Sequence, residues 1–425
     1  MLRRVVITGL GVLACNGIGK ENFWQASISG RSGIKKIAHF DASQLQSRIA
    51  GEITDFDPLT LGVMEIETFV TDRNTQLSLA AANLALKDAG LFNALSEDER
   101  DATGVYMGSA MASGEEGEKL WNTLTGCGAH PPKNLANEFI PPTLFMTHAP
   151  AAAIATHHQL HGPCTVISTG CSAGSDAIGQ AFWTIQEGRA DRMLAGGTDS
   201  ALSNMCMNVF CVLGAMSTRN DDPERASRPY DRHRDGFVMA EGAGVLVLEE
   251  REFALARNAH IYAEIIVFAS NVSAHHMTAL PPDGGPLQQL LCQTIEEAEI
   301  TAYELDYINS HGSSTPSNEA AETAAYKAAF GEHAYHIPIS ATKSMIGHAQ
   351  GAASAIEAIV TALVVDQQII PPTINQVEAD PQCDLDYVPN VARHAAVNVA
   401  LTHSSGFGGV NSALILAHRD WLDKH

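Results

Sequence analysis

Residues 167–179, ISTGCSAGSDAIG, place a cysteine among glycine, serine and alanine directly after an apolar run. The preceding residues 163–169, PCTVIST, have the β-branched content of a buried strand, and the sequence predicts a helix from about Ser172 to Gln186. This order puts Cys171 at a helix N-terminus, where the helix dipole and unpaired backbone N–H groups favour a thiolate. Cys171 is therefore a candidate nucleophile, although free cysteine is often simply a buried residue.

Short apolar strands and longer helices alternate along the rest of the chain. A helix with Leu and Ala at helical spacing, closed by Gly90, is expected over residues 73–91. Further strands are predicted at residues 3–12, 102–110, 191–200, 263–273 and 306–313, with two more around the glycine turn in 399–417. The alternation predicts an α/β layered fold with buried, largely parallel sheets.

The plan of the Cys171 region occurs a second time. Residues 337–365, IPISATKSMIGHAQGAASAIEAIVTALVV, again run from a strand through a small-residue turn into a long Ala-rich helix. The repetition predicts two duplicated halves, which we place at residues 1–255 and 256–425. The polar, proline-bearing residues 220–235 are expected to form a surface excursion between elements.

Composition excludes several classes of partner. The 425 residues carry a net charge of -22, which argues against nucleic acid and against anionic membrane surfaces. No apolar stretch approaches the roughly 18 residues of a membrane span, and the opening MLRRVVITGLGVLAC is interpreted as a strand and turn rather than a lipoprotein signal. The eight cysteines show no zinc spacing and favour a reducing, cytoplasmic location.

A dinucleotide site is the alternative outside the favoured class. Residues 9–14, GLGVLA, match G-x-G-x-x-A after a strand, the fingerprint of a dinucleotide-binding oxidoreductase. That reading also needs a second strand ending in an acidic residue about 20 residues later. No such strand follows, so a plain tight turn is favoured.

Two histidines follow predicted strands and lie next to glycine. His311 stands in DYINSHGS and His348 in ISATKSMIGHAQGA. A histidine alone is more often a surface or core residue, but two at equivalent strand ends, together with Cys171, predict one shared pocket. Lys343 and Glu322 lie in the same stretches, and we expect them to pair and orient the site.

Five stretches carry a family resemblance. They are STGCSAG (168–174), ASRPYDRHRDGFVMAEGAG (226–244), INSHGSSTP (308–316), KSMIGHAQGA (343–352) and SGFGGVNSA (405–413). In order and spacing they resemble the signatures of the β-ketoacyl-acyl carrier protein synthases, and the match covers essentially the whole chain. Details such as HGSSTPSNE, HMTAL and CDLDYVPNVAR look closest to the ketosynthase-α subunits of type II polyketide synthases, with fatty-acid synthase II as the nearest neighbour.

The resemblance implies a fold and a reaction. The fold would be the thiolase-like α-β-α-β-α arrangement, with the nucleophile in the first half and both histidines in the second. Cys171 would take an acyl chain from the phosphopantetheine arm of an acyl carrier protein, with the backbone N–H groups of Cys171 and Phe407 as oxyanion hole. His311 and His348 would hold the malonyl thioester oxygen during a decarboxylative Claisen condensation. No metal or other cofactor is required.

The resemblance also assigns supporting residues. Lys343 and Glu322 match the family's supporting polar pair. Phe407 resembles a mobile gate and Met111, in GSAMASG, an acyl-pocket gate. The positions that match contacts to the substrate and its pantetheine arm are Thr278, Ser313, Thr315, Gly406 and Gly408.

The chain departs from the family pattern at several positions. Gly170 replaces the commoner alanine, Glu319 stands where Asp is usual, and Ser405 stands where Phe is frequent. The helix that usually offers basic residues to the carrier protein reads GVMEIETFVTDRN, residues 62–74, with acids instead. This difference concerns carrier docking rather than the chemistry.

The resemblance further implies a dimer. We expect a heterodimer with a homologous, cysteine-less chain-length factor, formed through residues 139–160, FIPPTLFMTHAPAAAIATHHQL, where Phe139, Ile140, Leu144, Phe145 and Met146 are hard to place in a solvated loop. Packing of this stretch beneath its own lobe is the alternative. A homodimeric synthase II of fatty-acid elongation also stays open. A thiolase is disfavoured, since SGFGGVNSA lacks the second cysteine.

Overall fold

The computed structural model describes residues 2–132 and 141–423, and a single large sheet runs through this part of the chain. Its strands follow the order β11-β10-β14-β15-β9-β1-β8-β7-β5-β6, with β2 (Gly17–Ile18) beside β1. Two small sheets, β3 (Lys35–Lys36) with β4 (Ile49–Ala50) and β12 (Ile369–Ile370) with β13 (Arg393–His394), lie outside it.

The large sheet consists of two equivalent sets of five strands. The first set is β1 (Val5–Ala14), β5 (Thr103–Gly108), β6 (Cys164–Ile167), β7 (Arg192–Asp199) and β8 (Gly242–Glu250). The second is β9 (Ala263–Val272), β10 (Tyr307–Asn309), β11 (Ile339–Ser340), β14 (Val399–Ser405) and β15 (Val410–Ala417). In both sets the spatial order is first, fifth, fourth, second, third. The duplication predicted from the sequence is confirmed.

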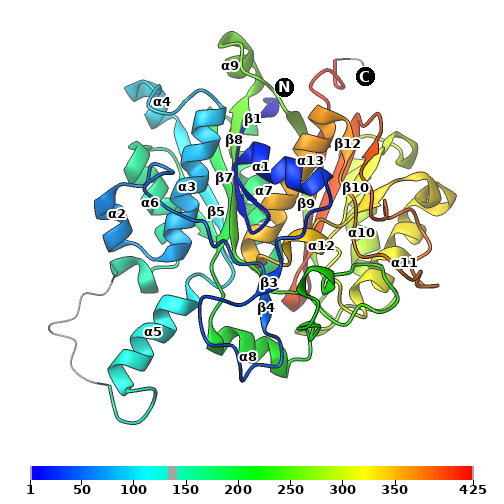
Figure 1. Ribbon diagram of the computed structural model, residues 1–425. Helices are drawn as coiled ribbons and strands as arrows, with labels where there is room; N and C mark the ends of the chain where they lie inside the picture. Colours follow the sequence, from blue (N-terminus) through cyan, green and yellow to red (C-terminus); the bar gives the residue numbers. More distant parts are fainter. Residues whose placement is uncertain (1, 133–140, 424–425) are drawn as a thin grey trace.

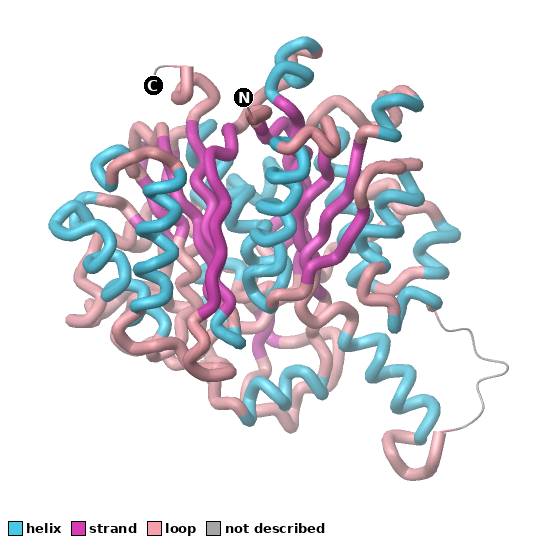
Figure 2. Tube along the Cα trace, turned by 180° about the vertical axis from the view of Figure 1, so that it is seen from behind, coloured by secondary structure: helices cyan, strands magenta, loops and turns pink. Residues whose placement is uncertain are grey.

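Helices cover both faces of each set, which gives five layers. α3 and α6 lie on the outer face of the first set, α10 and α11 on that of the second, and α7 and α13 lie between the two sets (Figures 1 and 2). The layered α-β-α-β-α fold is therefore confirmed. The helices are α1 (Lys20–Ile28), α2 (Glu65–Val70), α3 (Arg73–Asp88), α4 (Glu97–Asp101), α5 (Gly114–Thr125), α6 (Ala149–His158), α7 (Ala173–Gln186), α8 (Asn204–Val212), α9 (Arg251–Ala256), α10 (Gly285–Glu297), α11 (Asn318–Phe330), α12 (Lys343–Ile346) and α13 (Ala353–Gln367).

The expectation of largely parallel sheets is wrong for half of the strand pairs within each set, and β1 and β9, which join the two sets, are also antiparallel. In the first set β5 pairs in parallel with β6 and β7, whereas β8 is antiparallel to both β7 and β1. The second set repeats this pattern. The reason is local for β14 and β15, because the turn at residues 406–409 is too short for a crossover and returns the chain as a hairpin.

The glycines of residues 9–14 lie inside β1 and not in a strand-to-helix turn. They allow α3 to pack directly on the strand, because a Cβ added at Gly11 would lie 1.9 Å from the Ala81 carbonyl oxygen. A dinucleotide fingerprint needs a turn that opens a helix, so that interpretation of the motif is wrong. The favoured prediction of a tight turn is also wrong, because residues 9–14 continue the strand.

The two halves share one hydrophobic core. Buried residues of β1 and β8, such as Ile7 and Leu246, belong to the same cluster as Ile356 of α13 and Leu414 of β15. The predicted boundary at residues 255 and 256 lies within α9, between the last strand of the first set and the first of the second.

Two segments, residues 220–235 and 139–160, differ in burial from what the sequence predicted. Residues 226–231 are buried, so the predicted surface excursion at 220–235 is wrong for its central part. In the stretch 139–160, the side chains of Ala151 and Ile154 pack beneath their own half, whereas Met146 is exposed. Residues 139 and 140 lie outside the described residues.

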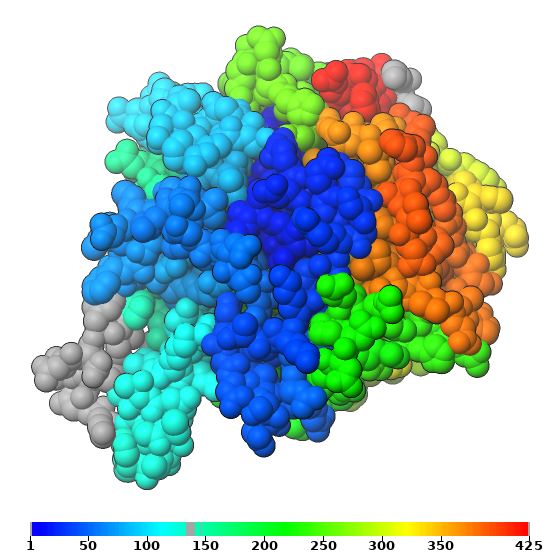
Figure 3. All heavy atoms as spheres, viewed as in Figure 1, coloured from blue at the N-terminus to red at the C-terminus, as the bar shows by residue number. Residues whose placement is uncertain are grey.

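One face of the molecule carries a projection formed by α5, which extends from the lower edge of the body (Figures 1 and 3) and exposes Trp121. In the described ranges, no helix has both the length and the apolar character needed to cross a bilayer.

Candidate active site

Cys171 lies at the N-terminal end of the central helix α7. It stands in a short 3₁₀ turn, Gly170–Ser172, directly before α7 begins at Ala173. Gly170 has φ of 66°, a left-handed conformation that glycine adopts without the strain that a Cβ would bring. Glycine thus suits this turn at the position where the family more commonly has alanine.

The sulfur of Cys171 faces two backbone donors. The backbone N–H groups of Phe407 and of Cys171 itself lie close enough to lower the pKa of its thiol. Burial nevertheless raises the pKa of the Cys171 thiol to about 11, although Lys343 and the Phe407 N–H act to lower it. The raised pKa runs against the expectation that the helix start favours a thiolate, since loss of hydration is the largest influence on this thiol.

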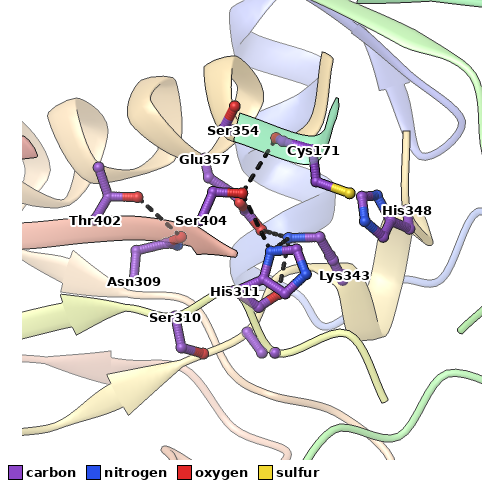
Figure 4. A network of polar contacts seen from close by, with 12 residues as sticks. Cys171, Asn309, Ser310, His311, Lys343, His348, Ser354, Glu357, Thr402 and Ser404 are labelled. Atoms are coloured by element: carbon purple, nitrogen blue, oxygen red, sulfur yellow. Dashed lines mark hydrogen bonds and ion pairs between the residues drawn. The ribbon is translucent and has the colours of Figure 1, made fainter. Parts of the chain in front are cut away.

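The two histidines meet at this cysteine. His311 follows β10 and His348 follows α12, and their ring centroids lie 5.3 Å apart with the planes at 77°. Figure 4 shows the Cys171 sulfur pointing toward the ring of His348, with the ring of His311 beside them. The pocket predicted from the three residues is present.

Hydrogen-bond partners define the tautomer of His348. Nδ1 of His348 accepts the backbone N–H of Gln350 at 3.1 Å, which leaves the ring proton on Nε2. Nδ1 of His311 lies 3.5 Å from the Lys343 ammonium and 3.2 Å from the Ser404 hydroxyl. Burial and the nearby Lys343 charge hold the pKa of both histidines well below the ordinary range. Both rings are therefore neutral.

Lys343 pairs with Glu357 and not with Glu322. Its ammonium forms an ion pair with the carboxylate of Glu357 and donates to the His311 carbonyl oxygen at 2.8 Å. Burial raises the pKa of Glu357 to about 7, although Lys343 acts to lower it. The expected Lys343–Glu322 pair is wrong because α13 carries Glu357 beneath Lys343, while Glu322 accepts the N–H of Gly312 at 3.1 Å.

Ser404 connects the nucleophile to His311. Its hydroxyl lies 3.1 Å from the Cys171 carbonyl oxygen and 3.2 Å from Nδ1 of His311 (Figure 4). The sequence reasoning missed both Ser404 and Glu357. Glu357 carried a usable signal, since it is the one charged residue within the otherwise apolar stretch 353–365.

A pocket of about 210 Å³ opens above these side chains. The predicted contact residues Thr278, Ser313, Thr315, Gly406 and Phe407 line it together with Cys171, His311 and His348. Phe407 also stacks on Phe210, with ring centroids 6.2 Å apart. The pocket mouth is thus formed by loops from both halves.

Several predicted site residues lie outside this pocket. Met111 is exposed, because Asp199 accepts the N–H groups of Ala110, Met111 and Ala112 and curls this turn away; its role as a gate of this pocket is not supported. Gly408 lies behind Phe407, with φ of 85° and its N–H on the Met277 carbonyl at 2.7 Å. Lys343 and Glu322 lie beneath the lining.

The arrangement supports nucleophilic acyl transfer. A thiol with two backbone N–H donors can form a thioester while an oxyanion is stabilised. Two neutral imidazoles with Nε2–H groups can stabilise a second negative charge in the same pocket. Of the described residues that line the pocket, Cys171 is the one cysteine, which disfavours a thiolase pair.

Comparisons with known proteins agree with this arrangement. Residues 2–254 match the family described as "Beta-ketoacyl synthase, N-terminal domain", and residues 262–377 match "Beta-ketoacyl synthase, C-terminal domain". The chain is 43% identical to the tetracenomycin polyketide synthase ketoacyl synthase alpha subunit of Streptomyces glaucescens, over 98% of this chain and 97% of that one. It is 41% identical to 3-oxoacyl-[acyl-carrier-protein] synthase 2 of Coxiella burnetii, over 98% of each.

Solved structures extend the likeness to the whole fold. One is a type II PKS acyl-carrier protein in complex with its ketosynthase bound to the hexaketide, with a TM-score of 0.91, 36% identity, and coverage of 99% of this chain and 100% of that one. Another is the ishigamide ketosynthase/chain length factor, with a TM-score of 0.88, 33% identity, and coverage of 98% and 99%.

Proposed function

The chain belongs to the β-ketoacyl synthase family, and we propose that it is the condensing acyltransferase of a type II polyketide synthase. In this role it joins a cysteine-bound acyl chain to a malonyl unit with loss of CO2. The observation that carries the proposal is the meeting of Cys171, His311 and His348 in one pocket beside two backbone N–H donors. The 43% identity to a polyketide ketosynthase supports the polyketide substrate class.

The first step is acyl transfer to Cys171. The sulfur attacks the thioester carbonyl of an acyl carrier protein, a new C–S bond forms, and the bond to the phosphopantetheine sulfur breaks. The Cys171 proton leaves with that sulfur, so the step needs no free thiolate. The Cys171 and Phe407 N–H groups, which now face the sulfur, are placed to hold the oxyanion. We place the pantetheine arm along Thr278, Ser313 and Thr315, which line the pocket.

The second step is decarboxylation of a malonyl thioester. The bond between the malonyl α-carbon and its carboxylate breaks, CO2 leaves, and the electron pair forms an enolate. Nε2–H groups of His311 and His348 donate to the enolate oxygen. Each such donor contributes on the order of 3 kcal/mol to lowering the barrier.

The third step is condensation. The enolate carbon attacks the Cys171 thioester, the new C–C bond forms, and the bond to the Cys171 sulfur breaks. The released sulfur takes one proton from solvent, in keeping with its high pKa. All three steps use groups of the chain and its substrates, and the proposal includes no metal or other cofactor.

The proposal includes two protein partners. A relative of known structure is bound to its acyl-carrier protein, and another is a ketosynthase/chain length factor pair. We place a carrier protein at the pocket mouth and a cysteine-less homologue on the first half. There β6 (Cys164–Ile167) is a partly exposed edge strand whose outer edge pairs with no other strand of the described residues. Eight unpaired cysteines support a cytoplasmic location.

The test combines mass and activity. The chain is purified alone and together with a cysteine-less homologue, then incubated with acyl and malonyl carrier proteins. We expect acyl mass on Cys171, CO2 release, and polyketide product from the pair. Absence of both acylation and CO2 release contradicts the function.

A homodimeric fatty-acid synthase II is the second candidate, supported by the 41% identity to such an enzyme. A homodimer that elongates saturated acyl chains unaided would favour it over the heterodimer. Its acylation and CO2 release would be the same, so product analysis decides between the two.

A further inference from the structure

A buried tyrosine lies behind the loop that carries His311. Tyr230 belongs to the segment 226–236, which wraps that loop: the Arg228 N–H donates to the Ser314 hydroxyl at 2.9 Å, and the Gly236 N–H to the Ser314 carbonyl at 3.0 Å. Tyr230 itself has φ of 65°, a conformation that a bulky residue rarely adopts. Its ring stacks on Tyr387 at 3.7 Å between centroids, with planes 10° apart. The surroundings thus hold a strained residue in one position.

The hydroxyl of Tyr230 connects to the active site through one carboxylate. It donates to Oε2 of Glu322 at 2.7 Å, and Oε1 of Glu322 accepts the backbone N–H of Gly312 at 3.1 Å. Glu322 is 1% exposed, so water does not supply replacement donors. Burial raises the pKa of Glu322, and the hydrogen bonds from Tyr230 and Gly312 act to lower it.

Gly312 fixes the backbone of His311. Its φ of 43° is left-handed, and a Cβ there would lie 2.3 Å from the Cβ of Ala341, so the peptide has little room to shift. Lys343 holds the carbonyl oxygen of His311 at 2.8 Å on one side, and Glu322 holds the next N–H on the other. These two contacts set the direction in which the His311 ring enters the pocket.

We propose that Tyr230 is a positioning residue for the reaction: its hydroxyl holds Glu322, which holds the Gly312 amide and thereby the aim of His311. This inference rests on the proposed function for its kinetic consequence. Replacement by phenylalanine preserves the ring stack on Tyr387 and removes one donor from a buried carboxylate. Glu322 then accepts the Gly312 N–H less firmly, since a carboxyl that takes up a proton is a weaker acceptor.

Tyr387 provides a matched control. It is the other half of the stacked pair and equally buried, but its hydroxyl hydrogen-bonds with the Thr323 hydroxyl at 2.7 Å, whereas that of Tyr230 donates to Glu322. Tyr230→Phe and Tyr387→Phe therefore each remove a hydroxyl oxygen from one of two neighbouring rings. Only the Tyr230 hydroxyl belongs to the chain of hydrogen bonds that leads through Glu322 to the backbone of His311.

The experiment compares both variants with the wild-type protein. For Tyr230→Phe we expect kcat of CO2 release from malonyl carrier protein to fall roughly tenfold, the loss typical of a hydrogen bond to a charged group. KM for that carrier and the rate of Cys171 acylation should stay within about twofold, because neither depends on the aim of His311. Tyr387→Phe should leave all three unchanged, and thermal unfolding monitors folding in each protein.

A double-mutant cycle separates a positioning effect through Glu322 from a nonspecific loss of structural order around Tyr230. Once Glu322→Gln has removed the carboxylate, adding Tyr230→Phe should cost little more, because the two residues act on one path. Independent, additive losses would overturn the proposal, as would an equal fall in acylation and CO2 release.

Hydrogen exchange at the Gly312 amide provides a readout without turnover. Exchange should be faster in Tyr230→Phe than in Tyr387→Phe, and equal rates would overturn the proposal. If the wild-type protein released no CO2, the proposed function would fail, and the exchange comparison would still decide whether Tyr230 holds this loop.

Discussion

The backbone N–H of Gln350 donates to Nδ1 of His348 at 3.1 Å, which leaves the proton of the neutral ring on Nε2. A ring with this tautomer is a hydrogen-bond donor to substrate and not a base toward Cys171. The distinction separates two mechanisms that use the same three residues, and it can be tested with substitutions that keep or remove the donor.

Removal of either histidine should stop CO2 release more than acylation. His348→Ala or His311→Ala should slow CO2 release from malonyl carrier protein by about 10²–10³, the effect of losing one oxyanion donor, while some Cys171 acylation persists. His348→Gln, whose amide N–H reaches a similar position, should recover part of the rate. Normal CO2 release from both alanine variants would contradict the assignment.

Cys171→Ala should abolish acyl labelling and leave the fold intact. Intact mass after incubation with acyl carrier protein measures the label, and thermal unfolding measures the fold. Cys206→Ala is a suitable control, because Cys206 is about as buried as Cys171 but does not line the pocket. A Cys171→Ala protein that still gains the acyl mass would show that another residue is the acceptor.

Alkylation of Cys171 should increase with pH well into the alkaline range. Because burial raises the pKa of its thiol to about 11, only a small fraction is thiolate at neutral pH. The measurement is the initial rate of iodoacetamide labelling at Cys171, followed by peptide mass spectrometry, with the exposed Cys292 as internal comparison. A rate that levels off below pH 8 would contradict this protonation state.

Asp176→Asn should stabilise the protein at alkaline pH. Burial raises the pKa of Asp176 to about 6 from its ordinary 3.8, so the folded state binds the proton more tightly than the unfolded state. The stabilisation of the folded state by protonated Asp176 is fully present below about pH 4 and is lost as pH rises through 6. At pH 8 the variant should gain on the order of 3 kcal/mol over wild type, with little difference at pH 4, as measured by thermal unfolding at both values.

Phe210→Trp should shorten the acyl chain that Cys171 accepts. Phe210 lines the pocket and stacks with Phe407, so a larger ring removes volume next to the nucleophile. Met111→Trp is the comparison, since Met111 does not line the pocket. The measurement is competition among acyl carrier proteins of different chain length. A shorter product from Met111→Trp alone would restore Met111 as a gate, through a surface that a partner covers.

The position of the three central residues could be predicted because local signals mark it. Cys171 and His348 each follow a strand and precede an Ala-rich helix, and glycines flank His311 and His348. Parallel pairing of β10 with β11 brings the two histidine-bearing strand ends together. β6, which precedes Cys171, lies at the other end of the strand order, so the meeting of all three residues depends on the packing of α7 against α13.

The partner of Lys343 could not be predicted in this way. Glu322 and Glu357 both lie on helices that follow strands, and the choice depends on how α11 and α13 pack in three dimensions. The burial of residues 226–231 could not be predicted, because their polar composition is typical of a surface segment. Their charged groups find partners inside the protein: Asp231 accepts the N–H groups of Val377 and Glu378 from a distant loop.

The raised pKa of the Cys171 thiol was also not visible in the sequence. A helix start is visible in sequence, whereas the loss of water around Cys171 is a property of the assembled pocket, to which loops of the second half contribute. Helix propensity and the position of a helix dipole can be predicted from local sequence, whereas desolvation depends on which distant segments cover the group.

The equal strand order of the two halves has a consequence for the symmetry of the site. A chain of two identical halves would present two equivalent centres, one at the start of each central helix. The two helix starts differ here: Cys171 lies directly before α7, whereas His348 lies shortly before α13. The equivalence of the halves is therefore broken by their side chains, and under the proposed function one helix start loads the acyl chain while the other supports carbon–carbon bond formation.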